Sequence, residues 1–432
     1  GQFCESRIMH SRMSARSSAP IMLLGMFGVA AGAASAVVTI VPSIYLAVLT
    51  SFGLAPRRRG DGEPDRTEAV RFAVFVPAHD EESGITDTID SLLAQNYPCA
   101  DFEVHVVADN CSDATAEAAG LAGATVHERN SSDERGKGHA LNWLFDRLDP
   151  EMFDVVVIVD ADTVAEPTFL AALARSFDGG ADAVQGFYGV RDIESSPVIA
   201  LRFAALACRH HLRPLGRHTV GASCGLYGNG MAFRTVVLER HRWSGHLIED
   251  AEFQMHLLLD GVIVEYAPDA RIAAEMPSSL EAAISQHERW EAGRASLVRR
   301  FVPGLARRAL VGGALRRRAY LDAMLDHLTP PVTMIALLDA TALVGGVVGR
   351  TVGWRRSGSI VAWIGSLATV VLIVHVFGAL RAVSAPGEVY RSLLDAPKLI
   401  LWKTSLLKDV SGRADGVAWT RTTRNASHAD AP

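Results

Sequence analysis

The order of apolar and polar positions divides the chain into three long apolar runs and one large mixed region. The first run, residues 21–54, carries no charge and is about 34 residues long, although a single membrane span needs only about 20. It predicts either one long tilted helix, with a bend available at Pro42, or a tight helical hairpin. The runs at 329–350 and 358–381 each have the length of one span. We therefore expect a multi-pass membrane protein.

Residues 66–295 show a different pattern, in which short apolar runs alternate with segments of helical spacing. The strand-like runs are RFAVFVPA, FEVHVVAD, ATVHER and DVVVIVD, and the helix-like segments between them are ITDTIDSLLAQN, DATAEAAGLAG and GHALNWLFDRL. This alternation predicts an α/β domain built from βαβ units with a parallel sheet. Ligands bind such sheets at the carboxyl ends of the strands, so the residues after each strand are the candidates for chemistry.

The positions of the arginines predict how the chain sits in the membrane. Arginines follow the first apolar run at 57–59 and are frequent between 294 and 318, ahead of the second run. Because basic residues concentrate on the cytoplasmic side, the α/β domain is expected there, although three arginines between the last two runs oppose this trend. Segment 296–328 mixes arginine pairs with apolar residues, which favours amphipathic helices on the membrane surface. The chain ends predict an N-terminal tail (1–20) and a cytoplasmic amphipathic tail (382–432).

Composition narrows the function classes. Of 432 residues, 49% are hydrophobic, and the formal net charge of −6 gives no basic balance for binding nucleic acid. The five cysteines form neither a CxxC pair nor a Cys/His pattern suited to zinc, which indicates reduced thiols. No GxGxxG or GxxxxGK[ST] follows the first strand, which argues against a dinucleotide fold and a P-loop.

Acidic residues follow the predicted strands. Asp160 and Asp162 flank one residue after the strand DVVVIVD. Two carboxylates this close raise each other's pKa unless a cation lies between them, and their oxygens suit Mg²⁺ or Mn²⁺. Capping of the following helix explains the same pair equally well.

Other polar positions have both a chemical and a structural interpretation. Glu249 and Asp250 begin a predicted helix, where acids are favoured as caps, but either could also act as a general base. Lys137 lies between two glycines, as a flexible cation able to reach phosphate or as part of a solvated turn. The glycine-rich segment 225–234 allows either a close backbone approach to a ligand or a bend in the sheet.

The segment SQHERWEAGR places an amide, a cation and an aromatic ring on one helical face. Gln286, Arg289 and Trp290 are three and four residues apart, so they are neighbours on a helix. Burying glutamine and arginine without partners is costly, which argues against a purely packing role. With a metal on Asp160 and Asp162, fixed cations and a base, the set could displace a nucleoside diphosphate from a sugar.

In its motifs the sequence resembles the processive family-two glycosyltransferases, the group of cellulose, hyaluronan and chitin synthases. VPAHDEE, ADNCSDAT, DAD, IED and QHERW occur here in that family's order over about residues 70 to 295. The resemblance implies a GT-A, Rossmann-like catalytic domain with flanking transmembrane and interfacial helices. It also implies a divalent cation, Mg²⁺ or Mn²⁺, held by Asp160 and Asp162.

The resemblance further implies roles for single residues. Asp250 would be the catalytic base, and Trp290 with Glu249 would contact the acceptor. Arginine suits phosphate through its planar fork, and an aromatic ring suits the apolar face of a sugar. The nucleotide-sugar would be bound by the following residues: Pro77, His79, Glu81, Asp109, Lys137, Asp160, Asp162, Gln286 and Arg289.

The expected reaction moves a sugar from a nucleotide-sugar, a UDP-hexose or UDP-N-acetylhexosamine, to a glycan or lipid-linked acceptor. It would invert the anomeric centre and form a β-linkage in exopolysaccharide or cell-envelope glycan synthesis. The expected location is the inner (plasma) membrane, in contact with its lipids. The chain could also form a homo-oligomer or bind an export partner.

Some positions depart from the family pattern. Asp80 stands where asparagine is commoner and Ile248 where threonine is commoner, but neither removes a catalytic group. The expected spans are fewer than large synthases use, which leaves single transfer to a lipid acceptor as an alternative, and a catalytically silent nucleotide-sugar-binding subunit as another. Asp339, inside a span, indicates a buried partner, an oligomer contact or a position at the edge of the span.

Overall fold

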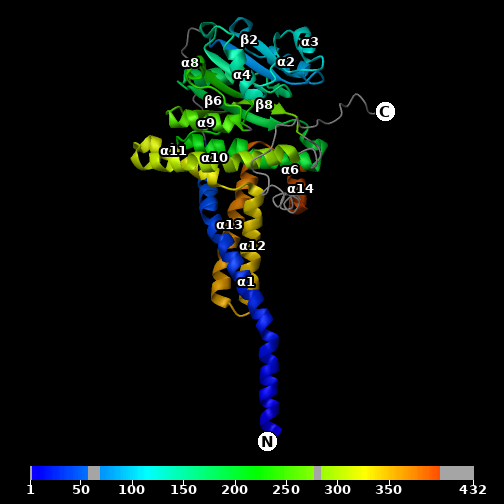
Figure 1. Cartoon of the computed structure of the whole chain (residues 1–432), viewed down its shortest axis with the longest axis vertical. Helices are drawn as coiled ribbons and strands as arrows, with labels where there is room; N and C mark the ends of the chain where they lie inside the picture. Colours follow the sequence, from blue (N-terminus) through cyan, green and yellow to red (C-terminus); the bar gives the residue numbers. More distant parts are fainter. Residues whose placement is uncertain (1, 57–68, 247, 277–283, 399–432) are drawn as a thin grey trace, which may run out of the picture.

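The computed structural model describes residues 2–56, 69–246, 248–276 and 284–398, with only the backbone described for 2–21, 24, 284–292, 314 and 315. Most of the tail predicted at 382–432 lies outside these residues. Figure 1 shows an α/β domain at one end of the molecule, a bundle of long helices below it, and a layer of helices between the two.

A single eight-stranded sheet forms the centre of the α/β domain. Its strand order is β3-β2-β1-β4-β7-β6-β8-β5. The first four strands are parallel, as the sequence predicts, but β7 runs antiparallel to both β4 and β6, and β5 runs antiparallel to β8. Because β6 and β8 again pair in parallel, the prediction of a parallel sheet is wrong only for β7 and β5. The strand bounds are β1 Phe72–Ala78, β2 Phe102–Asp109, β3 Thr125–Arg129, β4 Val155–Ile158, β5 Thr163–Ala165, β6 Ala183–Val190, β7 Met231–Arg234 and β8 Val264–Ala274.

Helices cover both faces of this sheet. In β1, Phe72, Val74 and Val76 point into the core formed with α2 and α5, while Ala73 and Phe75 point into the core formed with α4, α8 and α9. Burial on both faces explains why the strand sequences are almost continuously apolar. The helix bounds are α2 Ile85–Leu93, α3 Thr115–Leu121, α4 Lys137–Phe145, α5 Phe169–Asp178, α8 Thr235–Arg240 and α9 Glu249–Leu259.

Three described helices are long and apolar enough to cross a membrane. They belong to α1 (Gln2–Gly53), α12 (Val332–Thr351) and α13 (Arg355–Ala382). Of the two arrangements predicted for the first run, the structure has the single helix, which also continues through the residues expected to form a tail. The bundle is closely packed, because a Cβ added to Gly345 of α12 would clash with the carbonyl oxygen of Gly28 in α1.

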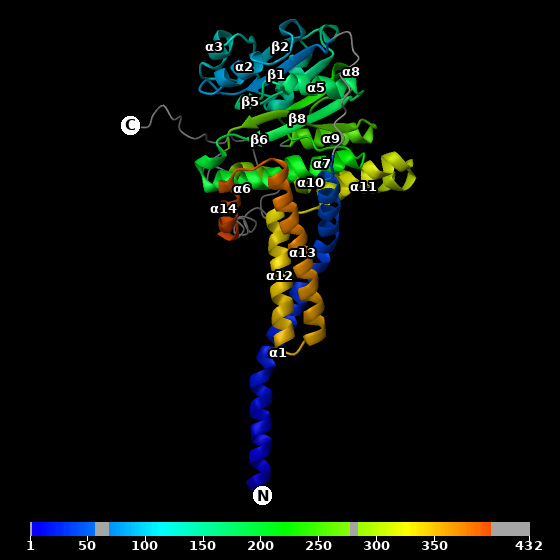
Figure 2. The same cartoon turned by 180° about the vertical axis from the view of Figure 1, so that it is seen from behind.

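Between the bundle and the sheet domain lies a layer of helices, visible from both sides in Figures 1 and 2. The division expected at residue 295 falls inside one continuous helix, α10, so the segment with the QHERW motif and the surface segment after it form one element. The layer consists of α6 (Pro197–Leu206), a π-helix (Ala207–Leu212), α7 (Arg213–Thr219), α10 (Ile284–Val311), α11 (Ala314–Leu328) and α14 (Gly387–Ser392). Short 3-10 turns occur at Cys99–Asp101, Pro150–Met152, Ile193–Ser195 and Leu393–Asp395.

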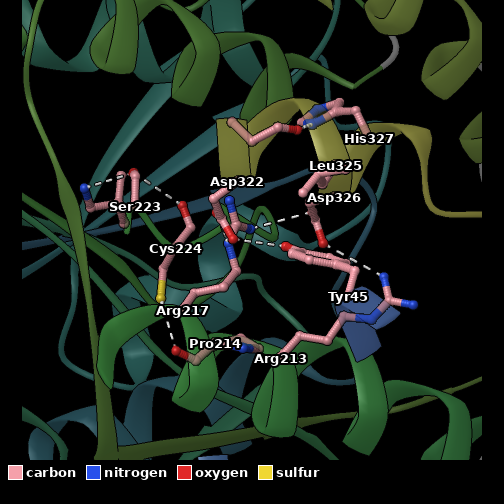
Figure 3. Close-up of polar contacts among 12 residues, drawn as sticks. Tyr45, Arg213, Pro214, Arg217, Ser223, Cys224, Asp322, Leu325, Asp326 and His327 are labelled. Atoms are coloured by element: carbon pink, nitrogen blue, oxygen red, sulfur yellow. Dashed lines mark hydrogen bonds and ion pairs between the residues drawn. The ribbon is translucent and has the colours of Figure 1, made fainter. Parts of the chain in front are cut away.

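A cluster of buried charges joins the bundle to the layer, and Figure 3 shows it in close-up. Arg217 of α7 is 1% exposed and pairs with Asp322 of α11 at 2.6 Å and with Asp326 at 3.3 Å. Arg213 approaches Asp326 at 3.6 Å, and the hydroxyl of Tyr45 in α1 donates to Asp322 at 2.9 Å. Two arginines thus balance two aspartates, and three helices distant in sequence are tied together.

Asp339 lies inside the bundle. Its residue is 1% exposed, and it is near Thr39 of α1. This burial matches neither the edge of a span nor an outward-facing oligomer contact, and neither carboxylate oxygen has a hydrogen-bond partner among the described residues.

Candidate active site

The acidic strand ends meet the glycine-rich loop at the middle of the sheet. Asp160 follows β4, and its backbone N–H donates to the side-chain oxygen of Asn229 at 3.0 Å. The amide nitrogen of Asn229 donates to Thr163 at 2.8 Å, just beyond Asp162. Asn229 is fully buried, so the loop before β7 holds the Asp160–Asp162 turn in position.

Lys137 is the first residue of α4 and so belongs to neither a flexible loop nor a solvated turn, while its role toward phosphate stays a prediction. Its ammonium donates to the carboxylate of Asp160 and to the carbonyl oxygen of Gly228. Burial disfavours the charged form, but the carboxylates of Asp160, Glu249 and Asp250 outweigh it and raise the pKa of Lys137. A permanent cation therefore faces the acidic turn.

Asp250 also lies beside Gly228, in the first turn of α9. A Cβ built on Gly228 would be 3.4 Å from Oδ2 of Asp250 and 3.8 Å from Nζ of Lys137. Burial raises the pKa of Asp250, although the N–H of Ala251 and the charge of Lys137 lower it. Burial and the neighbouring charge of Asp250 also raise the pKa of Glu249. A carboxylate with a raised pKa is a better proton acceptor than an ordinary one.

The loop after β1 is fastened to the loop after β2. His79 Nδ1 lies 2.7 Å from the carbonyl oxygen of Asp109, and the backbone N–H of Glu81 donates to Thr115 at 2.7 Å. Asp80 has a φ of 55° and accepts from the N–H of Ser112 at 2.6 Å. Pro77 is in β1, directly before this turn. The first-loop residues named from the sequence therefore lie beside Asp109.

Asp109 has a partner that sequence reasoning missed. Arg129, at the end of β3, donates to Oδ1 of Asp109 at 2.6 Å, and its side chain is 2% exposed. A second nitrogen of Arg129 donates to the carbonyl oxygen of Glu134 at 2.7 Å. The only signal in the sequence was an arginine at the end of β3, the strand next to β2, which ends in Asp109. This signal is weak.

The motif helix is tied to the helix that carries Asp250. Gln286, Arg289 and Trp290 lie in α10, as the spacing predicts, but their side chains are outside the described part of the chain. Further along α10, Arg300 pairs with the buried carboxylate of Glu252 in α9. This pair, also missed from the sequence, fixes the first turn of α9 relative to α10.

One site at the carboxyl ends of the central strands therefore holds the loop after β1 and four side chains, those of Lys137, Asp160, Asp162 and Asp250. This arrangement offers hard oxygen ligands, a fixed cation and a basic carboxylate within one site. Such a site can hold a diphosphate and accept a proton beside it.

Comparison with known proteins agrees with this geometry. The family model "Glycosyltransferase like family 2" matches residues 70–293, just over half of the chain. The chain is 26% identical to "Probable glycosyltransferase YdaM" of Bacillus subtilis over 54% of its own length and 58% of the relative's. It is 25% identical to the hyaluronan synthase of Streptococcus pyogenes over 51% and 56% of the two lengths. The chain thus spans little more than half of these curated relatives.

A solved structure shares the fold. A mannosyltransferase from Pyrobaculum calidifontis, solved in complex with GDP-Man and Mn²⁺, matches with a TM-score of 0.50 at 19% identity. The match covers 83% of this chain and 99% of the mannosyltransferase. The expected GT-A fold is therefore confirmed, and with a family match over just over half of its length the chain belongs to glycosyltransferase family 2.

Proposed function

We propose that the chain is a membrane-bound, inverting, metal-dependent glycosyltransferase. It moves a sugar from a nucleotide-sugar, a UDP-hexose or UDP-N-acetylhexosamine, to a glycan acceptor, and forms a β-linkage in exopolysaccharide or cell-envelope glycan synthesis. The observation that carries the proposal is the arrangement of Lys137, Asp160 and Asp250 around Gly228. The catalytic domain faces the cytoplasm, and α1, α12 and α13 hold it at the plasma membrane.

The donor is bound by the two joined loops and the Asp160–Asp162 turn. Pro77, His79 and Glu81 contact the nucleotide, and Asp109, held by Arg129, fixes the base. Gln286 and Arg289 of α10 contact the diphosphate. The cost of ordering this site is reduced because hydrogen bonds already join its loops.

The acidic turn fits Mg²⁺ or Mn²⁺. Asp160 and Asp162 offer carboxylate oxygens, the ligands these ions prefer, and the side chain of Asp160 is 33% exposed and so accessible. A bound divalent cation supplies positive charge to the leaving diphosphate. Lys137 holds the Asp160 carboxylate in position and adds a second positive charge at the same place.

Asp250 acts on the acceptor, which Trp290 and Glu249 position. It accepts the proton of the acceptor hydroxyl as that oxygen bonds to the anomeric carbon. The bond from the anomeric carbon to the diphosphate oxygen breaks at the same time, and the nucleoside diphosphate leaves with that electron pair. A single displacement of this kind on an α-linked donor yields a β-glycoside.

A second candidate is transfer of one sugar to a lipid acceptor without extension. The tight contact of Gly345 with Gly28 favours it, since a glycan strand cannot pass between α12 and α1 as they are packed.

The test is a panel of UDP-sugars and GDP-mannose with the detergent-solubilised full chain, membrane lipid extract and Mg²⁺ or Mn²⁺. We expect nucleoside diphosphate release from one donor, lost on chelation of the metal and in Asp160→Asn. Product size then separates extension from single addition. Binding of nucleotide with no release from any donor would contradict the proposal and favour a catalytically silent subunit.

A further inference from the structure

An aromatic stack runs beside the proposed catalytic residues. The ring of His210 lies between Tyr188 and Tyr227, with centroids 5.3 Å and 4.1 Å away and interplanar angles of 21° and 22°. Tyr227 directly precedes Gly228, whose carbonyl oxygen accepts from Lys137 and beside which Asp250 lies. His210 belongs to the π-helix Ala207–Leu212, so the stack joins that helix to the loop before β7 that carries Gly228. π-Helical turns occur frequently at functional sites.

The stack fixes the backbone of one exposed arginine, Arg209. The hydroxyl of Tyr227 donates to the backbone carbonyl of Arg209 at 3.0 Å, next to His210. The side chain of Arg209 is exposed, and its charge acts on Asp250. Among the described residues, no carboxylate lies within ion-pair distance of its guanidinium. The backbone of Arg209 is thus joined to the loop that carries Gly228, and the charge of its side chain acts on Asp250.

The same π-helix lies directly on the ends of the membrane helices. Leu212, three residues after Arg209, packs against the end of α1, because a Cβ added to Gly53 would be 2.9 Å from its side chain. It also packs against α13, where a Cβ on Gly378 would be 3.7 Å away. Arg209 is therefore near the level of the lipid headgroups. Its charge also acts on Asp250, the proposed base.

We propose that Arg209 is an acceptor-binding residue for a membrane lipid that carries a phosphate next to its reacting hydroxyl. The acceptor has to meet Arg209 near the headgroups and Asp250 in the site. A lipid of this kind does both, since its phosphate lies at the membrane surface and its hydroxyl reaches Asp250. Guanidinium groups bind phosphate through paired, charge-assisted hydrogen bonds. The inference rests on the proposed function and assigns the acceptor class of that site.

Binding without turnover tests it. The full chain in neutral detergent is titrated with dihexanoyl phosphatidic acid, dihexanoylglycerol and inorganic phosphate, for the native sequence, Arg209→Gln and Arg209→Lys. Arg381→Gln is the matched control, because Arg381 is an exposed arginine in the last turn of α13. We expect the phosphatidic acid to bind more tightly than the other two probes. Loss of a charged phosphate contact should weaken this binding about tenfold in Arg209→Gln, less in Arg209→Lys and not in Arg381→Gln.

Several outcomes would overturn the inference. Equal binding of phosphatidic acid by the native chain and Arg209→Gln would show that Arg209 does not hold the phosphate. Inorganic phosphate binding as tightly as the lipid would indicate a site for free phosphate. A shifted pH profile of transfer with unchanged lipid binding would limit Arg209 to tuning Asp250. Because no turnover is needed, a chain that binds the lipid but transfers no sugar would count against the proposed function alone.

Discussion

Arg217 supports the most quantitative prediction, because its guanidinium is buried between two carboxylates. Its side chain is 1% exposed, and it pairs with Asp322 at 2.6 Å and Asp326 at 3.3 Å (Figure 3). Arg217→Met keeps much of the apolar stem and removes only the charged head. The variant leaves Asp322 and Asp326 buried with only the 3.6 Å pair from Arg213 to balance them.

Removing one partner of a buried pair costs about 3–5 kcal/mol, whereas an exposed pair contributes about 0–1 kcal/mol. Arg71→Met is the matched control, since its pair with Asp154 at 3.0 Å has side chains 44% and 38% exposed. With roughly 2–4 °C per kcal/mol, the melting midpoint of Arg217→Met should fall by about 6 °C or more. Adding Asp322→Asn restores the balance of charges and should recover part of the loss.

The loss should also depend on pH. Burial raises the pKa of Asp326, but the charges of Arg217 and Arg213 outweigh it and hold that pKa at about 2. A carboxyl whose pKa is lowered on folding stabilises the fold above its unfolded pKa, and this stabilisation is lost as the pH falls through the folded value. The difference between the native chain and Arg217→Met should therefore be full at neutral pH and narrow below about pH 4.

The assay is thermal unfolding in detergent, followed by tryptophan fluorescence at one scan rate. A fall in Arg217→Met no larger than in Arg71→Met would refute the reasoning, as would a difference that does not change with pH.

Three further predictions concern single residues. Lys137→Met removes a charge that lowers the pKa of Asp250, so the acid limb of the transfer rate should move to higher pH; an unmoved limb would contradict this. Gly228→Ala puts a side chain at a φ of +79° and 3.4 Å from Oδ2 of Asp250, so steady-state transfer should fall. The control is Gly180→Ala, which has a φ of +96° and nothing within 4 Å, and it should leave transfer unchanged. In Asp339→Leu the melting midpoint should rise, since neither carboxylate oxygen has a hydrogen-bond partner among the described residues; a lower midpoint would indicate that Asp339 has a stabilising partner.

The sequence predicts well those features that a local pattern determines. The strands β1, β2, β3 and β4 appear where apolar runs predict them, because a strand buried on both faces must be apolar along its length. The acidic turn at Asp160 lies at the carboxyl end of β4, as the parallel half of the sheet requires. The direction of β7 was not predictable, since the pattern of a single strand does not record its orientation.

Contacts between residues distant in sequence were also beyond prediction. The pairs of Arg129 with Asp109 and of Lys137 with Asp160 depend on the order of strands in the sheet. The expected boundary at residue 295 followed the end of a motif, not a helix stop signal. The segment holds no strong breaker before Pro303, and α10 continues even through that residue.

The most direct test of the central claim is transfer of labelled sugar by Asp250→Asn. The measurement pairs the transfer rate, with membrane lipid extract as acceptor, with the affinity for the nucleoside diphosphate. We predict that transfer falls by about 10²–10⁴, the usual contribution of a positioned base, while nucleotide affinity is retained. Transfer at the native rate in Asp250→Asn would contradict the account, because the reaction would then not need the Asp250 carboxylate as a base.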